Sequence, residues 1–223
     1  MALLSDVELS QSDVVANCRM NRERVLRGGN GYVRELGLDP VEFLSERLKR
    51  RSHVAWLDLC CGAALALGEA AGELGDRAKV IGVDLVVPHR VPDGVELIEA
   101  NLASWRPKRR FDLVTCVHGL HYVGDKLGLI ARAAGWLESD GLFVATLDPA
   151  NLRLADGRPA SRVALAALRR AGFQYDRRRH VLIRRGAAKV EFGLRYLGGD
   201  DAAGPNFSGQ PAVNSHYAPA NEG

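Results

Sequence analysis

The stretch VAWLDLCCGAALALGEAAG, residues 54–72, decides the fold predicted for this chain. Residues 54–61 are a short apolar run with a single acid, Asp58, a pattern typical of a buried β-strand. Gly62 follows, and from about residue 63 to residue 74 the sequence is rich in Ala and Leu, which favours an α-helix. The stretch therefore predicts a strand, a turn of small residues and a helix.

Similar units follow along the chain. Four more apolar runs are predicted to be strands: residues 79–86, 95–102, 111–119 and 141–148. Helices are predicted for residues 127–137 and 161–173. Strands that are apolar throughout and alternate with helices indicate a parallel sheet covered on both faces. The predicted fold class is α/β, a Rossmann-like, doubly wound sheet of seven strands, mostly parallel, that ends in an antiparallel hairpin.

The two ends of the chain differ from this core. Residues 1–52 are predicted to form an N-terminal helical cap or lid, and residues 53–198 the α/β core. In the final hairpin, residues 179–186 are expected to pair with residues 189–198 across a short Gly-Ala-Ala turn. Residues 199–223 are rich in Gly, Pro and Asn and are expected to be a C-terminal tail with little capacity to form a core.

The composition is that of an ordinary globular protein. The 223 residues are 47% hydrophobic and 26% charged, which excludes wholesale disorder. No apolar run approaches the roughly 18 residues needed to span a bilayer, and the N-terminal sequence lacks the pattern of a secretory signal. The four cysteines show neither a disulfide framework nor a metal-binding spacing. A cytoplasmic, single-domain protein without a membrane partner is expected, and its oligomeric state is left open.

Basic residues are concentrated in one part of the chain. Residues 151–200 contain 12 basic and 4 acidic side chains, a balance of +8, whereas the net charge of the whole chain is +3. A basic surface can attract nucleic acid or an anionic small molecule. No nucleic-acid-binding motif accompanies these residues, so a solvated helix and hairpin is the simpler interpretation.

The expected ligand site lies at the carboxyl ends of the central strands, because ligands bind there in doubly wound sheets. Asp58 is near the end of the first strand, and the small residues after it let the backbone approach a ligand closely. Asp84 ends the next strand, where its carboxylate can accept both hydroxyls of a ribose. These features also suit a dinucleotide enzyme, but the GxGxxG spacing of such enzymes is absent.

The order of the motifs resembles that of the class I S-adenosylmethionine-dependent methyltransferases. LDLCCGAA (57–64) resembles the first motif of that superfamily, VIGVDL (80–85) its acidic second-strand motif and EANL (99–102) its third-strand motif. FDLVTCVHGLHYV (111–123), a helix and DGLFVATL (140–147) resemble its fourth and fifth strands. Any one of these motifs is common, whereas the ordered set, over about residues 54–197, is specific.

The resemblance implies S-adenosyl-L-methionine as the cofactor and a set of residues that bind it. Asp58 and Gly62 would line the methionine end, Asp84 would hold the ribose hydroxyls, and Leu85 would pack on the adenine. Asn101 would take the adenine amino group. The full set of expected cofactor-binding residues is Asp58, Cys60, Gly62, Asp84, Leu85, Asn101, Leu102, Val117 and His118.

Two residues depart from the first motif of the superfamily, DxGxGxG. Cys60 and Ala64 stand where its first and third glycines are common. Ala64 would add a methyl group where the backbone passes nearest the carboxypropyl chain of the cofactor, which either weakens binding or shifts the loop. Cys60 and Cys61 are expected to be buried small residues rather than redox or metal-binding groups.

Two histidines are candidates for a catalytic base. His118 and His121 lie in CVHGLHY, directly after the fourth strand, where relatives place residues that face the substrate. A base is needed only when the acceptor must lose a proton as it attacks the methyl group. The alternative for His121 is that it caps or packs this turn. No spacing of His, Cys or acidic residues predicts a metal site.

A lid over the ligand site is expected from residues 12–34. Glycines 28, 29 and 31 interrupt this segment and permit a hinge, and Asn30 and Tyr32 beside them could close over a ligand. Tyr122, after the fourth strand, is a third candidate for contact with substrate. The alternative for the segment is a plain packing helix. The Arg-rich residues 21–37 also resemble those of bacterial members of the superfamily.

The function expected from the resemblance is methyl transfer from S-adenosylmethionine to an O, N or C atom of a small molecule. One alternative is an RNA methyltransferase, which the basic residues 151–200 favour, although the Asn-Pro-Pro-Tyr motif for base amines is absent. The other alternative is a cofactor-binding protein without methyl transfer, either a regulator or a non-methylating cyclase, which the two missing motif glycines favour.

Overall fold

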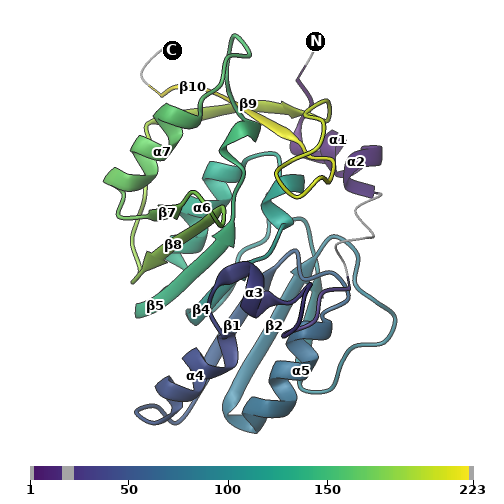
Figure 1. Cartoon of the computed structure of the whole chain (residues 1–223), viewed down its shortest axis with the longest axis vertical. Helices are drawn as coiled ribbons and strands as arrows, with labels where there is room; N and C mark the ends of the chain where they lie inside the picture. The colour runs from purple at the N-terminus through teal and green to yellow at the C-terminus, as the bar shows by residue number, and fades with distance from the viewer. Residues whose placement is uncertain (1–2, 17–22, 221–223) are drawn as a thin grey trace.

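The structure is a computed structural model that describes residues 3–16 and 23–220. Two β-sheets are present in these residues (Figure 1). The strands of the larger sheet are β1 (Val54–Leu59), β2 (Ala78–Asp84), β3 (Val95–Glu99), β4 (Phe111–Cys116), β5 (Leu137–Thr146), β7 (Gln174–Asp176) and β8 (Val181–Arg185). The strands of the smaller sheet are β6 (Leu152–Leu154), β9 (Leu194–Asp200) and β10 (Asn214–Pro219).

The larger sheet has the strand order β3-β2-β1-β4-β5-β8-β7. Strands β1 to β5 are parallel to one another, and β8 is antiparallel to both β5 and β7. Because the order reverses beside β1, the carboxyl ends of β1 and β4 form the switch point at which a doubly wound sheet binds ligands. The predicted fold class is confirmed.

Helices cover both faces of the larger sheet. They are α1 (Asp6–Ser10), α2 (Asp13–Ala16), α3 (Tyr32–Leu36), α4 (Pro40–Leu48), α5 (Leu65–Leu74), α6 (Lys126–Gly135) and α7 (Ser161–Arg170), with short 3-10 helices η2 (Gly75–Arg77), η3 (Gly119–Tyr122) and η4 (Pro149–Asn151). Side chains of α3, α4 and α5 form one apolar cluster with Trp56 of β1, and side chains of α6 and α7 form another with Leu57 and Leu59. Alternate side chains of β1 therefore point to opposite faces of the sheet.

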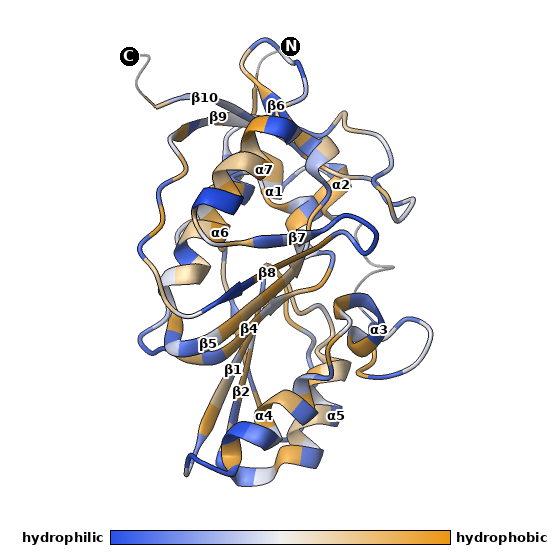
Figure 2. Cartoon of the chain, turned by 60° about the vertical axis from the view of Figure 1, so that its left-hand side comes forward, coloured by the Kyte–Doolittle hydropathy of each residue, from blue (hydrophilic) through white to orange (hydrophobic). Residues whose placement is uncertain are grey.

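The strands are hydrophobic because both of their faces are covered. All residues of β1 and β4 are buried, and Figure 2 shows hydrophobic residues along β4, β5 and β8 between the helical layers. The start of α4 is determined by its local sequence. Asp39 caps the helix by accepting a hydrogen bond from the Val41 backbone N–H at 2.9 Å, and Pro40 occupies its first turn. Among the described residues, no helix is long and apolar enough to cross a membrane.

The position of the predicted hairpin is wrong. The hairpin in the larger sheet pairs β7 with β8, so residues 181–185 have a partner that precedes them in the chain. Residues 194–200 instead form β9, which pairs with β10 in the smaller sheet. The apolar residues of both predicted strands fitted a hairpin, and the choice of partner depended on contacts far away in sequence.

The prediction that residues 199–223 have little capacity to form a core is also wrong. Strand β10 lies at the centre of the smaller sheet, and Tyr217 is 1% exposed. The Tyr217 hydroxyl accepts a hydrogen bond from the Leu127 backbone N–H at 2.9 Å and donates to Asp125 at 3.2 Å. The fully buried Lys126 ammonium donates to the Val213 carbonyl oxygen at 2.6 Å. These contacts fasten the C-terminal segment to the start of α6.

The N-terminal segment also joins the smaller sheet. Leu4 pairs with Gly199 of β9 through two backbone hydrogen bonds of 2.8 and 2.9 Å. Helix α1 follows, capped by Ser5 and Glu8 in a reciprocal capping box. The N-terminal and C-terminal segments thus both belong to the smaller sheet, and the two chain ends lie at opposite sides of it (Figure 1). The predicted helical segment 12–34 includes residues 17–22, which lie outside the described residues.

Candidate functional site

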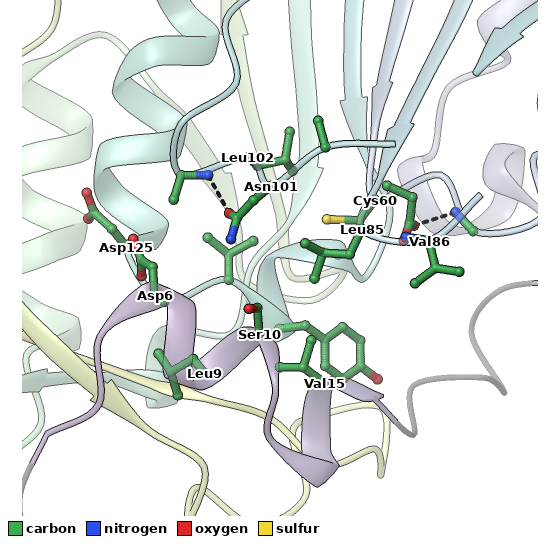
Figure 3. Close-up of a pocket in the computed structure, with 18 of the residues that line it drawn as sticks. Asp6, Leu9, Ser10, Val15, Cys60, Leu85, Val86, Asn101, Leu102 and Asp125 are labelled. Atoms are coloured by element: carbon green, nitrogen blue, oxygen red, sulfur yellow. Dashed lines mark hydrogen bonds between the residues drawn. The ribbon is translucent and has the colours of Figure 1, made fainter. Parts of the chain in front are cut away.

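A cavity of about 360 Å³ lies at the carboxyl ends of β1, β2, β3 and β4. Its size falls within the roughly 300–1,000 Å³ of small-molecule sites. Eight of the nine residues expected to bind a cofactor line it: Cys60, Gly62, Asp84, Leu85, Asn101, Leu102, Val117 and His118. Asp58, the ninth, does not. Figure 3 shows several of these side chains facing residues of α1 and α2 across the cavity.

The loop between β1 and α5 has an unusual backbone. Cys60, Gly62 and Ala64 all have positive φ angles, of 58°, 58° and 56°. These are the three glycine positions of the motif that the sequence resembles, and the left-handed conformation costs an L-residue roughly 1–2 kcal/mol. The chain therefore keeps the loop conformation that glycine ordinarily provides, although two of the residues are strained in it.

The side chains of the two non-glycine residues take different directions. Ala64 is 2% exposed, packs in the apolar cluster of α4 and α5, and is not among the residues that line the cavity. Its methyl group therefore points into this apolar cluster, and the expectation that it stands nearest the carboxypropyl chain of the cofactor stays a prediction. Cys60 does line the cavity, and its hydrogen bond with the Cys116 thiol, followed by burial, raises its pKa well above the ordinary value, so it is a neutral wall residue.

Asp84 joins this loop to the second strand. One carboxylate oxygen accepts a hydrogen bond from the Gly62 backbone N–H at 2.8 Å, and the other accepts from the Val86 N–H at 3.3 Å. The carboxylate is half-buried at the wall of the cavity, where a ligand can reach it. Leu85 and Val86, which follow it, are 37% and 55% exposed and form an apolar edge of the cavity.

The far end of the cavity, beyond β3, is rich in hydrogen-bond acceptors. The Asn101 side-chain oxygen accepts from the Ala103 backbone N–H at 2.9 Å (Figure 3). Asp6 and Asp125 lie beside each other near it, and burial followed by the charge of Asp125 raises the pKa of Asp6. An amino group of a ligand would find several oxygen atoms at this end.

Asp58 lies beneath the cavity rather than in its wall. Its side chain is fully buried and accepts hydrogen bonds from the Tyr32 hydroxyl, at 2.7 Å, and from the Thr115 hydroxyl. Burial raises the pKa of Asp58 to about 7, against an ordinary value of 3.8. The carboxyl group therefore braces the end of β1 against α3 and β4.

The raised pKa predicts a measurable dependence of stability on pH. Between roughly pH 4 and pH 7 the folded protein holds a proton on Asp58 that the unfolded chain releases. The resulting stabilisation is fully present below the unfolded pKa and is lost as the pH rises through 7. From pH 5 to pH 7, the free energy of unfolding of the wild type should fall by roughly 2 kcal/mol more than that of Asp58→Asn.

Urea denaturation of both proteins at several pH values checks this prediction. Asp93→Asn, at an exposed acid in the loop after β2, is the control and should follow the wild type. Parallel pH curves for Asp58→Asn and the wild type would contradict it.

His118 lies at the cavity, and contacts with Thr146 and Glu35 hold it there. Its φ angle is 59°, and its backbone N–H donates to the Thr146 hydroxyl at 2.6 Å. Its ring Nε2 lies 3.0 Å from the Glu35 carboxylate, which lies 3.5 Å from the Arg24 guanidinium. The hydrogen bond with His118 lowers the pKa of Glu35 despite partial burial, so Glu35 is a carboxylate and Nε2 carries the proton toward it.

The other candidate residues occupy different places. His121 is fully buried and does not line the cavity, whereas Tyr122 does. Tyr32 is 3% exposed and bonded to Asp58, and Asn30 accepts from Arg24 at 2.6 Å. Neither of these two residues lines the cavity, so the structure does not place them as a lid.

The cover of the cavity comes from α1 and α2, which lie within the predicted cap of residues 1–52, but the residues that form it are not the Asn30 and Tyr32 that the sequence singled out. Their residues that line the cavity are Asp6, Leu9, Ser10 and Val15 (Figure 3). The capping box of Ser5 and Glu8 was a visible signal for the start of α1. Its position over the cavity depends on the pairing of Leu4 with β9, which no local pattern indicates.

The comparison with protein families agrees with this geometry. A family model described as a methyltransferase domain matches residues 30–183. The chain belongs to this family. The matched part of the methyltransferase includes β1 to β7 and the loops that carry Cys60, Asp84, Asn101 and His118, whereas α1, α2, β9 and β10 lie outside it.

Solved structures similar to the methyltransferase share little sequence with it. The plantazolicin methyltransferase BpumL, in complex with a pentazolic desmethylPZN analog and SAH, is 13% identical, with a TM-score of 0.40 over 47% of this chain and 43% of that chain. Coclaurine N-methyltransferase, bound to N-methylheliamine and SAH, is 18% identical, with a TM-score of 0.37 over 56% and 41%. The DhpI–SAH complex is 21% identical, with a TM-score of 0.43 over 70% and 89%.

The alignments thus span less than half the length of the first two of these proteins. No curated protein matches the sequence.

Proposed function

We propose that this methyltransferase transfers a methyl group from S-adenosylmethionine to a small molecule. The observation that carries the proposal is a hydrogen bond within one wall of the cavity: Gly62, in the left-handed loop of residues 60–64, donates its backbone N–H to the Asp84 carboxylate. Such a wall presents a tight backbone turn and a carboxylate side by side, which suits the amino-acid and ribose parts of this cofactor.

The residues of the cavity fit the cofactor. Asp84 would accept the ribose hydroxyls, and Leu85 and Leu102 would pack on the adenine. The exocyclic amino group of the adenine is a hydrogen-bond donor and would meet the acceptors at the far end of the cavity. The Asn101 side-chain oxygen there already accepts one hydrogen bond, and the carboxyl groups of Asp6 and Asp125 supply further oxygen atoms. Cys60 and Gly62 would line the methionine end. The neighbouring structures crystallised with SAH, S-adenosylhomocysteine, support this assignment only as relatives.

The bound cofactor would supply an electrophilic methyl group on a sulfonium sulfur. The protein then has to align the acceptor and, where the acceptor carries a proton, remove it. His118 is suited to the second task, because Glu35 fixes the tautomer with the proton on Nε2 and leaves Nδ1 as the basic nitrogen. His121, which is buried away from the cavity, is less suited to it.

A small acceptor is favoured over RNA because residues of α1 and α2 cover part of the cavity. The cytoplasmic location and the division into cap, core and tail stay predictions.

Isothermal titration calorimetry with S-adenosylhomocysteine tests the proposed cofactor. Binding of one molecule per chain is expected. Heat no larger than that of a titration with homocysteine would show that the cavity does not take this nucleoside.

A further prediction concerns the cover. Because α1 and α2 line the cavity, S-adenosylhomocysteine should slow amide hydrogen exchange in residues 9–16 by about tenfold, as bound ligand suppresses local opening. Residues 28–31, which do not line the cavity, should exchange at the same rate with and without ligand. The opposite pattern, with protection at 28–31 alone, would restore the lid expected from the sequence.

A further inference from the structure

Three histidines and a phenylalanine gather beside the cavity and are called here the histidine cluster: His118, His121, His180 and Phe207. The ring centroids of His118 and His121 are 5.5 Å apart, and Phe207 lies 5.7 and 5.3 Å from them. Phe207 also stacks on His180, with centroids 4.0 Å apart and planes inclined by 6°. The four rings come from the segment after β4, the turn before β8 and the loop before β10.

The histidines of this cluster have unused polar atoms. Within the part of the chain that the structure describes, both ring nitrogens of His121 and Nδ1 of His118 are buried without a hydrogen-bond partner. Burial lowers the pKa of His121 well below its ordinary value, so its ring is neutral and has one donor and one acceptor nitrogen. Buried polar groups are nearly always satisfied, and exceptions often mark places where a water or ligand binds.

We propose that the histidine cluster is the binding site of the methyl acceptor and that it takes a planar aromatic ring that carries a hydroxyl group. This inference rests on the proposed function, since it assigns the acceptor to the side of His118 that faces away from Asp84. The hydroxyl group can both donate to and accept from the unpartnered ring nitrogens, which a group of only one kind cannot do.

The position of the Phe207 ring shows that the histidine cluster can hold a flat aromatic ring. Its ring lies flat on His180, whose Nδ1 is held by the Tyr175 hydroxyl at 3.0 Å. Phe207 fills the space between His180 and the pair His118–His121, called here the slot, stacked on His180 and tilted by 35° and 70° against the rings of His118 and His121. A planar ring can replace Phe207 in this slot with the same stacking contact, whereas a puckered ring cannot.

Phe207 can leave the slot without opening the protein core. Its side chain is 37% exposed, and its loop is held at the backbone, where the Phe207 N–H donates to Asp148 at 2.9 Å. Gly204 and Gly209, on either side, have positive φ angles, and no other atom lies within 4 Å of where their Cβ atoms would be. Phe207 thus acts as a cover that an acceptor displaces.

Binding of 4-nitrophenol, followed by its absorbance, tests this assignment on the full-length protein saturated with S-adenosylhomocysteine. We expect one site per chain. Phenol should compete with the probe, and cyclohexanol, which has the hydroxyl on a puckered ring, and nitrobenzene, which has a planar ring without a hydroxyl, should compete at least about tenfold more weakly.

Two variants separate the parts of the site. Phe207→Ala should tighten binding of 4-nitrophenol by about tenfold, because the probe no longer displaces a ring. Phe43→Ala, at a partly buried phenylalanine on α4, is the matched control and should leave binding unchanged. His121→Leu should weaken binding by about tenfold or more and raise the urea midpoint, because it removes two unpartnered nitrogens from the interior.

The outcomes distinguish this inference from the function on which it rests. Absence of 4-nitrophenol binding, equal competition by cyclohexanol, or unchanged binding in Phe207→Ala and His121→Leu would overturn the acceptor assignment while S-adenosylhomocysteine still binds. Failure of S-adenosylhomocysteine itself to bind in the calorimeter would overturn both.

Discussion

An Asp84→Ala variant is expected to bind S-adenosylhomocysteine about a hundredfold more weakly than the wild type, a loss of about 2.7 kcal/mol. Hydrogen bonds to a charged acceptor contribute roughly 1.5–3 kcal/mol each, and the ribose would offer two. Asp84 also accepts the Gly62 N–H, so its removal frees the loop that borders the methionine end of the cavity. Both effects act in the same direction.

Calorimetric titration of variants measures this effect. Asp84→Asn keeps the shape of the side chain and one acceptor oxygen, so its affinity should fall between those of the wild type and Asp84→Ala. Asp93→Ala removes an exposed acid from the same loop region and should bind as the wild type does. Unchanged affinity in a folded Asp84→Ala protein would show that the ribose is held elsewhere.

A His118→Ala variant is expected to turn over about 10²–10⁴-fold more slowly on an acceptor that must lose a proton. The ring is fixed by the Glu35 carboxylate and by its own left-handed backbone, which hold it at the cavity. Glu35→Gln should slow turnover by a smaller factor, because the imidazole remains but its tautomer is no longer set by a carboxylate. Affinity for S-adenosylhomocysteine should change little in either variant.

Steady-state rates of methyl transfer, measured beside calorimetry on the same samples, check this prediction. His53→Ala, at an exposed histidine before β1, is the control and should keep the wild-type rate. A near-wild-type rate in His118→Ala would instead support methyl transfer by alignment alone, with an acceptor that is already nucleophilic.

The central strands and the walls of the cavity could be predicted because their signals are local. The apolar runs that contain Asp58 and Asp84 become adjacent strands, since a buried parallel strand needs hydrophobic residues on both faces. The small residues from Cys60 to Ala64 form the expected turn, and Asp39 with Pro40 begins α4. Because neighbouring strands are parallel, their carboxyl ends lie at the same edge of the sheet, and the residues that follow them line one cavity.

The parts that could not be predicted depend on partners far away in sequence. Tyr32 follows a glycine-rich segment and resembled a lid residue, but the buried Asp58 holds its hydroxyl group. Tyr217 lies in a segment rich in Gly and Pro, yet it is buried because Asp125 and Leu127 supply hydrogen bonds at the start of α6. No local pattern of hydrophobicity records such pairs.

A crystal structure of the methyltransferase with S-adenosylhomocysteine tests the central claim most directly. The proposed function predicts that the ligand fills the cavity, with its ribose hydroxyls within hydrogen-bond distance of the Asp84 carboxylate, its adenine between Leu85 and Leu102, and its sulfur on the side of His118. A ligand bound outside this cavity, or bound in it with the ribose away from Asp84, would contradict the account.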